Sequence, residues 1–427
     1  MDQTRIPIPR YFLPFFGMLA AIVPFAIDAY LPAIPSMAVA FHVEVFQMNQ
    51  TISAFLIGYA LGQVFGGPFS DQLGRKVIGL SGLAILLVST FLILFVGDIF
   101  QLKVLRFIQA IGGGFTSVIC MASIRDVYPP HIAGRKYAVV TMIMLLMPLL
   151  APVIGSVLLP LGWKAIFLSM FTFILMAALI YIFGIPESRV VEKKRLDFNR
   201  IFSQFKQVIE RRNDENGRVI LYVLSMGFSA AVMLIFVTNS AFIYMEHFKV
   251  SPSRFPIFFG ANVILMMGFI RYSMHRMKTV HPHFLFTAGN LVQFSFSTLL
   301  LIYVLLFQAS LYPTFFLLVG TVGAMGLVNP NASAVYISHY DELSGSATSL
   351  NSMFILMMGG LIGGVVSVFL DNGLIPVAIG MFLCSLTSNL IGRSIPRPLS
   401  PFHKMEIDEL EAKEIDRVPS REVIGKR

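Results

Sequence analysis

One carboxylate, Asp28, stands well inside a long apolar segment of this 427-residue chain. An ionisable side chain at membrane depth is costly, so it is by default a functional residue. Arg106 occupies another apolar segment at a depth of roughly 7 to 8 Å, against roughly 9 Å for Asp28, at the helical rise of about 1.5 Å per residue. Burial favours the neutral acid and a nearby arginine favours the carboxylate, so a movement that separates the two would bind one proton and a movement that joins them would release it. The pair predicts a proton-coupling device; the alternative has Asp28 solvated at a cavity mouth and Arg106 bonded to backbone carbonyls.

A second charged group lies in a short loop that reads GPFSDQLGRK from Gly67 to Lys76. An acid such as Asp71 is stabilised by the positive N-terminal dipole of a facing helix, by about 0.3 to 2 kcal/mol depending on burial. Arg75 has a possible ion-pair partner in Asp126, at the end of a later apolar segment. These charges predict a gate, although they would also suit loops that only mark topology. The predicted gate consists of Gly67, Asp71, Gly74, Arg75, Lys76 and Asp126.

Other apolar segments carry helix breakers and isolated amides. Pro148 and Pro152, with Gly155, interrupt helical bonding and favour a kink where a helix lines a cavity, with simple packing as the alternative. The isolated amides either contact a substrate or join helices by hydrogen bonds. The candidate cavity residues are Gln109, Asn239, Asn262, Asn329, Asn331 and Asn351. A cavity lined with many Met and Phe would suit lipophilic molecules of varied shape. The chain has 23 Met and 40 Phe, although such residues in a membrane protein more often face lipid or form the core.

The elements that position these residues follow from composition. The chain is 56% hydrophobic and only 13% charged, with a mean hydropathy of +0.76, which excludes an ordinary soluble enzyme. A span needs about 20 apolar residues, so a dozen spans fit the length. The predicted fold is an all-α integral membrane protein with twelve transmembrane helices in two pseudo-symmetric six-helix bundles. The predicted spans are 11–33, 47–69, 77–96, 101–123, 138–160, 165–185, 219–244, 255–272, 283–307, 311–337, 345–370 and 374–393.

The net charge of +9 describes topology rather than nucleic-acid binding. Most of the 32 Lys and Arg residues fall in alternate loops and in the two tails, so the positive-inside rule places both termini in the cytoplasm. Trp163 then lies at the outer boundary of the membrane, where an amphipathic ring is favoured. No basic face alternates with base-stacking aromatic residues, so nucleic acid is not an expected partner.

Four regions follow from this reading. They are an N-terminal six-helix bundle (1–185), a cytoplasmic linker (186–218), a C-terminal six-helix bundle (219–393) and a cytoplasmic charged tail (394–427). Within the linker, apolar residues from Phe198 to Ile209 fall on one face of an amphipathic helix that would lie on the anionic inner leaflet. A weak internal repeat supports the two halves: Gly134, Met142 and Met147 align with Gly345, Met353 and Met358 at one constant shift.

The loop from Gly67 to Lys76 resembles the GxxxDRxGRR/K signature of the major facilitator superfamily. The run from Arg106 to Gly113 is similar to its RxxQGxG pattern, and APVIG at 151–155 resembles its antiporter motif. DAYLPAIP at 28–35 and GWKAIF at 162–167 resemble the Bcr/CflA branch of drug:proton antiporters. The resemblance implies that Asp71 faces the start of span eleven at Ser344 and Gly345. Three positions depart from the patterns: Gln72 replaces an Arg, Ala110 a Gly and Ser156 a Gly.

These features together predict a proton-coupled secondary transporter that exports small lipophilic drugs or metabolites by alternating access. The alternatives are a narrow metabolite or siderophore exporter and a proton-coupled uptake symporter on the same fold. The resemblance places the chain in a bacterial cytoplasmic (inner) membrane as a multi-pass monomer, with a small-molecule substrate, protons and lipid as its partners. No GxxxxGK[ST] nucleotide site, metal-ligand cluster or hydrolase motif occurs, so we expect no cofactor, no metal and no enzymatic activity.

Overall fold

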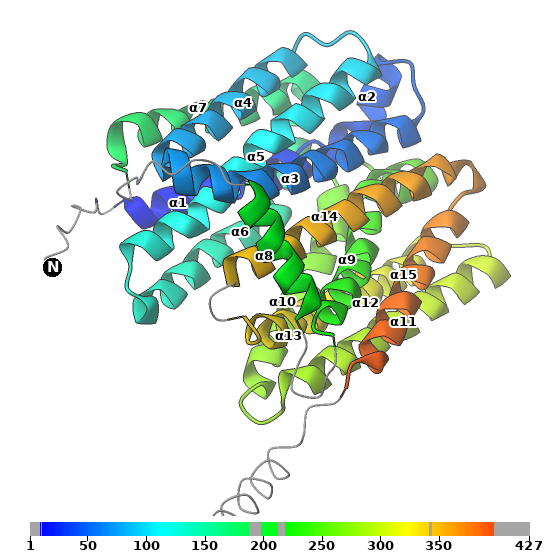
Figure 1. The fold of residues 1–427 in the computed structure, drawn as a ribbon. Helices are drawn as coiled ribbons and strands as arrows, with labels where there is room; N and C mark the ends of the chain where they lie inside the picture. The colour runs from blue at the N-terminus through cyan, green and yellow to red at the C-terminus, as the bar shows by residue number, and fades with distance from the viewer. Residues whose placement is uncertain (1–8, 10, 188–197, 212–217, 341–343, 397–427) are drawn as a thin grey trace, which may run out of the picture.

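The computed structural model describes residues 9, 11–187, 198–211, 218–340 and 344–396, and these residues are helical almost throughout (Figure 1). Twelve helices or joined helices are long and apolar enough to cross a membrane, which confirms the twelve predicted spans. They are Phe12–Ala40, Val45–Leu73, Arg75–Ile93, Ile99–Val127, Arg135–Leu161, Trp163–Gly184, Ile220–His247, Phe255–Arg276, Pro282–Leu306, Leu311–Ile337, Gly345–Val368 and Ile375–Ser394.

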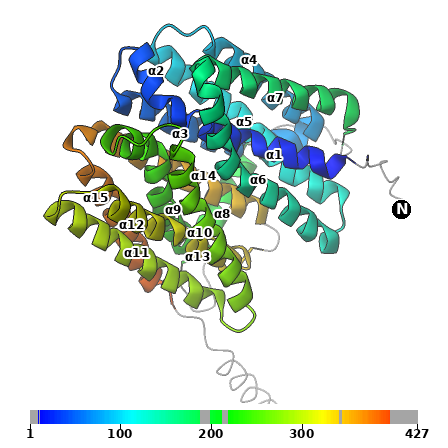
Figure 2. The ribbon, with the colours of Figure 1, turned by 180° about the vertical axis from the view of Figure 1, so that it is seen from behind.

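The helices form two bundles, an N-terminal half and a C-terminal half, with α8 (Phe198–Glu210) across one end (Figures 1 and 2). The N-terminal half contains α1 (Phe12–Asp28), α2 (Ile34–Ala40), α3 (Val45–Leu73), α4 (Arg75–Ile93), α5 (Ile99–Val127), α6 (Pro130–Leu158) and α7 (Trp163–Gly184). The C-terminal half contains α9 (Ile220–Ala241), α10 (Phe255–Arg276), α11 (Pro282–Leu306), α12 (Leu311–Gly323), α13 (Met325–Ile337), α14 (Ser344–Val368) and α15 (Ile375–Ser394). We call the end that holds Phe12 and Ser394 the inner end and the opposite end the outer end.

The first span is broken where the sequence predicts one continuous run. α1 ends at Asp28, a short 3₁₀ turn follows at Leu31–Ala33, and α2 begins at Ile34. Pro32 and Pro35 lie in the first turns of these two segments, where a missing backbone N–H is tolerated. The break therefore ends a helix at the buried carboxylate and leaves its last carbonyls without helical partners.

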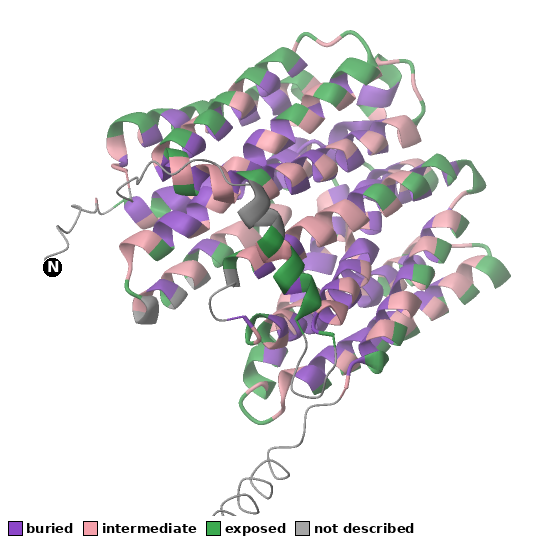
Figure 3. Ribbon diagram, in the orientation of Figure 1, coloured by how far each residue is buried: buried purple, intermediate pink, exposed green. Residues whose placement is uncertain are grey.

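Close packing within the N-terminal half depends on glycines. A side chain on Gly58 or Gly62 of α3 would overlap backbone carbonyls of α5, and a methyl group on Gly114 would lie 2.5 Å from Gly62 Cα. Because these side chains are single hydrogen atoms, the two helix backbones can touch. Buried residues accordingly fill the interior of each half (Figure 3).

The two halves meet along a seam that joins α3 to α14 and α6 to α10. At its outer part, Gly360 of α14 packs against the backbone of Ser53, and Asn49 Nδ2 donates to Asn239 Oδ1 at 3.5 Å. The Ser156 hydroxyl donates to the Pro252 carbonyl at 2.8 Å, from α6 to the loop before α10. These contacts hold the outer end of the seam closed in this structure.

The linker helix α8 lies against protein over part of its apolar face. Val208 is fully buried, and its carbonyl accepts a 2.7 Å hydrogen bond from the Tyr340 hydroxyl. Gln204 accepts a 3.2 Å hydrogen bond from Ser346 of α14, whereas Ile209 is exposed. The prediction that the apolar face of this helix lies on the lipid leaflet is therefore wrong for Val208. This residue packs into the inner end of the C-terminal half instead.

Candidate functional site

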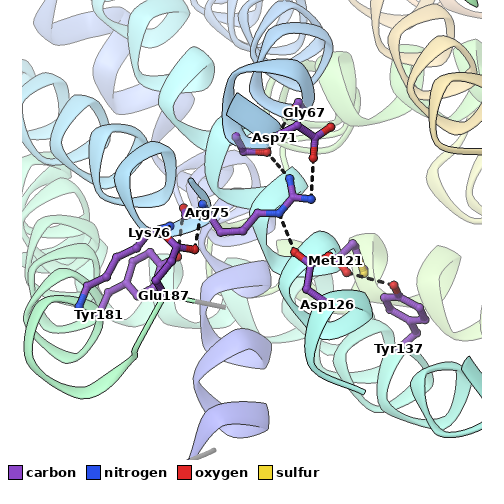
Figure 4. Close-up of polar contacts among 10 residues, drawn as sticks. Gly67, Asp71, Arg75, Lys76, Met121, Asp126, Tyr137, Tyr181 and Glu187 are labelled. Atoms are coloured by element: carbon purple, nitrogen blue, oxygen red, sulfur yellow. Dashed lines mark hydrogen bonds and ion pairs between the residues drawn. The ribbon is translucent and has the colours of Figure 1, made fainter. Parts of the chain in front are cut away.

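Arg75 is the centre of a polar network at the inner end, drawn in Figure 4. Its side chain is almost fully buried and lies 2.7 Å from Asp71 and 2.8 Å from Asp126. A third bond goes to the Ser70 hydroxyl at 2.5 Å. Arg75 thus bonds both carboxylates of the predicted gate at once, and the planar fork of its guanidinium directs a separate N–H group at each.

Glu187, which the sequence reasoning missed, completes this network. Its carboxylate accepts the backbone N–H groups of Arg75 at 3.1 Å and Lys76 at 2.9 Å, at the start of α4. An acid at a helix N-terminus satisfies orphan donors and complements the helix dipole. The sequence shows Glu187 as an acid directly after the sixth predicted span. Its bonds to the start of α4 could not be predicted, because they require α7 to end beside α4. We call Ser70, Asp71, Arg75, Asp126 and Glu187 the inner network.

The two predicted glycines of this loop differ in their roles. Gly74 has a φ of 98°, a conformation that other residues rarely adopt, and it forms the turn between α3 and α4. Gly67 has no such requirement, since an added methyl group would make only an ordinary 3.7 Å contact with Val118. Lys76 donates to the Ile182 carbonyl at 3.0 Å. Asp71, Asp126 and Ser70 all belong to the N-terminal half, so their bonds to the Arg75 side chain brace this half internally.

Arg106 is fully buried in α5 and lies between two aromatic rings. Its guanidinium carbon is 4.4 Å from the ring centres of both Tyr30 and Phe55. Nη2 donates to the Ala26 carbonyl at 3.0 Å, one of the carbonyls freed by the break after α1, and Nη1 donates to Gln109 Oε1 at 2.7 Å. Cation–π contacts and charge-assisted hydrogen bonds together offset much of the cost of burying the charge.

The predicted meeting of Arg106 with Asp28 is not formed in this structure. Among the described residues, no ion pair within 4.0 Å joins them, and the guanidinium takes the backbone alternative instead. Ala26 lies two residues before Asp28 on α1, so Arg106 still holds the segment that carries the carboxylate. Arg106 of α5 therefore bonds the backbone of α1 near Asp28 and forms no ion pair with the Asp28 carboxylate.

Asp28 lines a pocket at the seam, which we call the central pocket. Asp28 and Pro148 come from α1 and α6 of the N-terminal half, and Asn262 comes from α10 of the C-terminal half. The walls are apolar, with Met233, Phe236, Phe259 and Met266 among them. Water-sized molecules can occupy about 30 Å³ of this pocket, which is room for about two waters and too little for a drug-sized ligand.

Of the six predicted cavity amides, only Asn262 lines the central pocket. Gln109 is fully buried between Arg106 and Thr90, to which it donates at 2.6 Å, so its role is to hold the arginine. Asn239 bonds across the seam, and Asn331 donates to Ser273 at 2.5 Å within the C-terminal half. Asn329 and Asn351 also lie outside the lining of this pocket. Gln109 and these four amides therefore lie away from the central pocket, and their contact with a substrate stays a prediction.

The residues of the antiporter-like motif bring α6 against the break in the first span. α6 runs unbroken from Pro130 to Leu158 through both prolines, and Pro148 lines the central pocket. Pro152 is buried one turn further on. A side chain on Gly155 would overlap the backbone carbonyl of Ala29, which is the residue after Asp28. Gly155 thus allows α6 to approach the backbone that carries the buried acid.

Comparisons with known proteins agree with this arrangement. The model of the Major Facilitator Superfamily matches residues 16–364. A bicyclomycin resistance protein homolog of Haemophilus influenzae is 27% identical over 382 residues, covering 89% of this chain and 94% of that protein. The multidrug resistance protein MdtL of Salmonella paratyphi C is 27% identical over 61% of this chain and 65% of its own length. The crystal structure of a POT family transporter with a thioalcohol-conjugated peptide has a TM-score of 0.71 at 13% identity, covering 94% of this chain and 96% of that one.

Proposed function

The chain belongs to the Major Facilitator Superfamily, and we propose that it is a proton-coupled exporter of small lipophilic drugs or metabolites. The superfamily and the fold predicted from the sequence are thereby confirmed, and the protein is a multi-pass membrane transporter and not an enzyme. A relative named for bicyclomycin resistance agrees with the predicted Bcr/CflA-type branch. Export of drugs by this chain is carried over from the names of its relatives as part of the proposal.

The observation that carries the proposal is the position of Asp28. It is a buried carboxyl group in a pocket at the seam, on a segment held by Arg106. When the halves rock about the seam, the pocket opens to one side at a time, and Asp28 takes up a proton on one side and releases it on the other. Moving one charge through 100 mV supplies about 2.3 kcal/mol, enough for a gradient of roughly fiftyfold in a neutral substrate.

The closed outer end of the seam fits one stage of this cycle. The Asn49–Asn239 and Ser156–Pro252 contacts must break before the central pocket can open outward. The inner network holds α3, α4, α5 and the end of α7 together so that the N-terminal half moves as one body. We assign the predicted gate residues this bracing role within alternating access.

We further propose the bacterial cytoplasmic membrane as the location, a monomer as the working unit and both termini in the cytoplasm. The side chains support this orientation: Arg75, Lys76, Arg125 and Arg393 lie at the inner end, and Trp163 lies at the outer end, where its ring has Lys164 at 5.5 Å. The inner end as defined above is then the cytoplasmic end.

The test uses everted membrane vesicles and a pH-sensitive dye. Lipophilic drugs added to vesicles with the wild-type protein should dissipate an imposed proton gradient, and Asp28→Asn should not. Asp371→Asn is the matched control, because Asp371 is an exposed acid in the loop before α15. Dissipation by folded Asp28→Asn protein at the wild-type rate would refute coupling at this residue. Uptake of one nutrient instead of drug export would establish the symporter alternative.

A further inference from the structure

Two buried polar side chains lie one helical turn apart on α3, where this helix packs against the C-terminal half at the outer part of the seam. Asn49 is fully buried and Ser53 is 6% exposed. Among the described residues, neither the Asn49 Oδ1 atom nor the Ser53 hydroxyl has a hydrogen-bond partner. Buried polar groups in proteins are nearly always paired, so two unpaired groups on one face of a helix require an explanation. We call Asn49 and Ser53 the outer polar pair.

A glycine of the opposite half closes over the Ser53 hydroxyl. A methyl group on Gly364 of α14 would lie 3.0 Å from Ser53 Oγ and 3.2 Å from Ser53 Cβ. No water molecule fits between a hydroxyl and a backbone that are this close. The N–H groups of α14 at this level are used within their own helix, so they offer the hydroxyl oxygen no donor. Because Ser53 and Gly364 belong to different halves, this contact exists only while the outer end is closed.

Neighbouring hydroxyl groups make hydrogen bonds of a kind that Ser53 does not make. Thr51 donates to the Met48 carbonyl at 2.6 Å within the same helix. The Ser156 hydroxyl, which also lies at the seam, donates to the Pro252 carbonyl at 2.8 Å across the two halves. Helical serines and threonines can donate in this way to a carbonyl of the preceding turn. Ser53 faces α14 instead, and it loses its hydrogen bonds to water when the seam closes.

The amide of Asn49 is also poorly paired in the closed seam. Its Nδ2 donates to Asn239 Oδ1 of α9 at 3.5 Å, the long limit for a hydrogen bond. Turning the amide over would bring its oxygen against the Asn239 oxygen and would still leave its other end unpaired. The contact between α3 and the C-terminal half is therefore held chiefly by close packing against Gly360 and Gly364 of α14.

We propose that the outer polar pair opposes closure of the outer end and so keeps the closed and open states of the seam close in free energy. Opening separates α3 from α14 and lets water reach both groups, whereas close packing on the glycines favours closure. Leaving one buried group unpaired changes the equilibrium between the two states by about 5-fold or more. A carrier opens its outer end in every cycle, so a seam that packs this closely needs an opposing contribution. The inference goes beyond the proposed function, because this balance serves export and uptake alike.

Two serine-to-alanine changes on the same seam, with opposite expected effects, test the proposal. Ser53→Ala removes an unpaired hydroxyl and should favour closure, whereas Ser156→Ala removes a hydrogen bond and should favour opening. Every protein compared carries the reporter Asn239→Cys, since Asn239 is fully buried and faces α3. In full-length protein in lipid nanodiscs, this thiol reacts with a small charged methanethiosulfonate only when the seam opens. The native cysteines, Cys120 and Cys384, are buried.

We expect the reporter thiol to react about 5-fold or more slowly in Ser53→Ala and about twofold faster in Ser156→Ala. A rate proportional to the reagent concentration shows that the reaction reports the fraction of open molecules. Thr314→Val is the matched control, because Thr314 carries a buried and unpaired hydroxyl on α12, inside the C-terminal half. This control should leave the rate unchanged. Circular dichroism shows that each variant is folded.

An unchanged or faster reaction in Ser53→Ala would overturn the proposal, because a loss of packing alone loosens the seam. Equal slowing by Thr314→Val would also overturn it, since the effect would then come from general stability and not from the seam. The assay needs neither a drug nor a proton gradient. A failure of the proposed exporter therefore leaves this test intact, and a failure of this test leaves the proposed exporter standing.

Discussion

Asparagine at position 126 is expected to destabilise the N-terminal half more than asparagine at position 71, although Asp71 belongs to the recognised loop signature. Both acids bond the same Arg75 guanidinium, whose side chain is 2% exposed. The Asp126 side chain is 15% exposed and that of Asp71 is 50% exposed. Water screens the second pair much more than the first, so the two ion pairs have different strengths despite their similar lengths.

The expected magnitudes follow from this exposure. A hydrogen bond to a buried charged group contributes about 1.5 to 3 kcal/mol, which corresponds to about 10- to 150-fold in an equilibrium constant. An exposed ion pair contributes about 0.2 to 1 kcal/mol, or less than about 6-fold. Asp126→Asn therefore removes the larger share of what holds α5 to the start of α4. Because both carboxylates share one guanidinium, the stability losses of the two single variants should not add up to the loss of the double variant.

Thermal unfolding followed by circular dichroism, in one detergent and at one scan rate, measures the order. We expect Asp126→Asn to unfold at a lower temperature than Asp71→Asn, and Asp371→Asn to unfold at the same temperature as the wild type. Arg75→Lys should resemble the double variant, since an ammonium group cannot reproduce the planar fork. An equal or larger loss for Asp71→Asn would refute the assignment of strength by burial and would show that Asp71 has a stronger partner than Arg75.

Three further predictions concern the seam and the inner loops. Gly155→Ala should abolish transport, because its methyl group would overlap the Ala29 carbonyl and displace the break in the first span; normal drug export would contradict this. Ser156→Ala removes the hydrogen bond to the Pro252 carbonyl, which is worth about 0.5 kcal/mol at an exposed site. A cysteine introduced at the outer end of the seam should then react about twofold faster with a thiol reagent. An unchanged rate would show that this bond does not help to close the outer end. Burial lowers the pKa of His281, whose neutral ring caps α11, so the stability of that cap should fall as the pH drops below about 6.5; His281→Asn should keep the cap and lose this pH dependence, as amide exchange would show.

The sequence was sufficient for features that depend on local composition. Twelve apolar runs are enough to place twelve helices, because in a membrane every backbone group must be paired within its own segment. Gly58 and Gly62 recur at a helical spacing within one apolar run, a pattern that permits close helix contact. The turn at Gly74 and the acid Asp71 beside Arg75 were readable because their chemistry lies within a few residues of the chain.

The hydrogen-bond partners of Arg106 could not be predicted from the sequence, because the depth of a residue in the membrane does not fix the direction of its long side chain. Asp28 and Arg106 have similar depths, yet the guanidinium reaches the Ala26 carbonyl and lies between Tyr30 and Phe55. The prolines near this break were readable from the sequence, whereas the close approach of α6 to the broken segment at Gly155 depends on tertiary packing.

By itself, then, the sequence determined the membrane class, the number of spans and the superfamily, and it singled out Asp28, the acid that we propose carries the proton. These follow from hydropathy, from spacing and from motifs that lie within single segments. Only the tertiary structure decided that Glu187 caps α4, that Gln109 serves Arg106 and that Asn262 alone of the amides reaches the pocket of Asp28. Such contacts join residues far apart in the chain, and their geometry depends on how whole helices pack and rotate against one another.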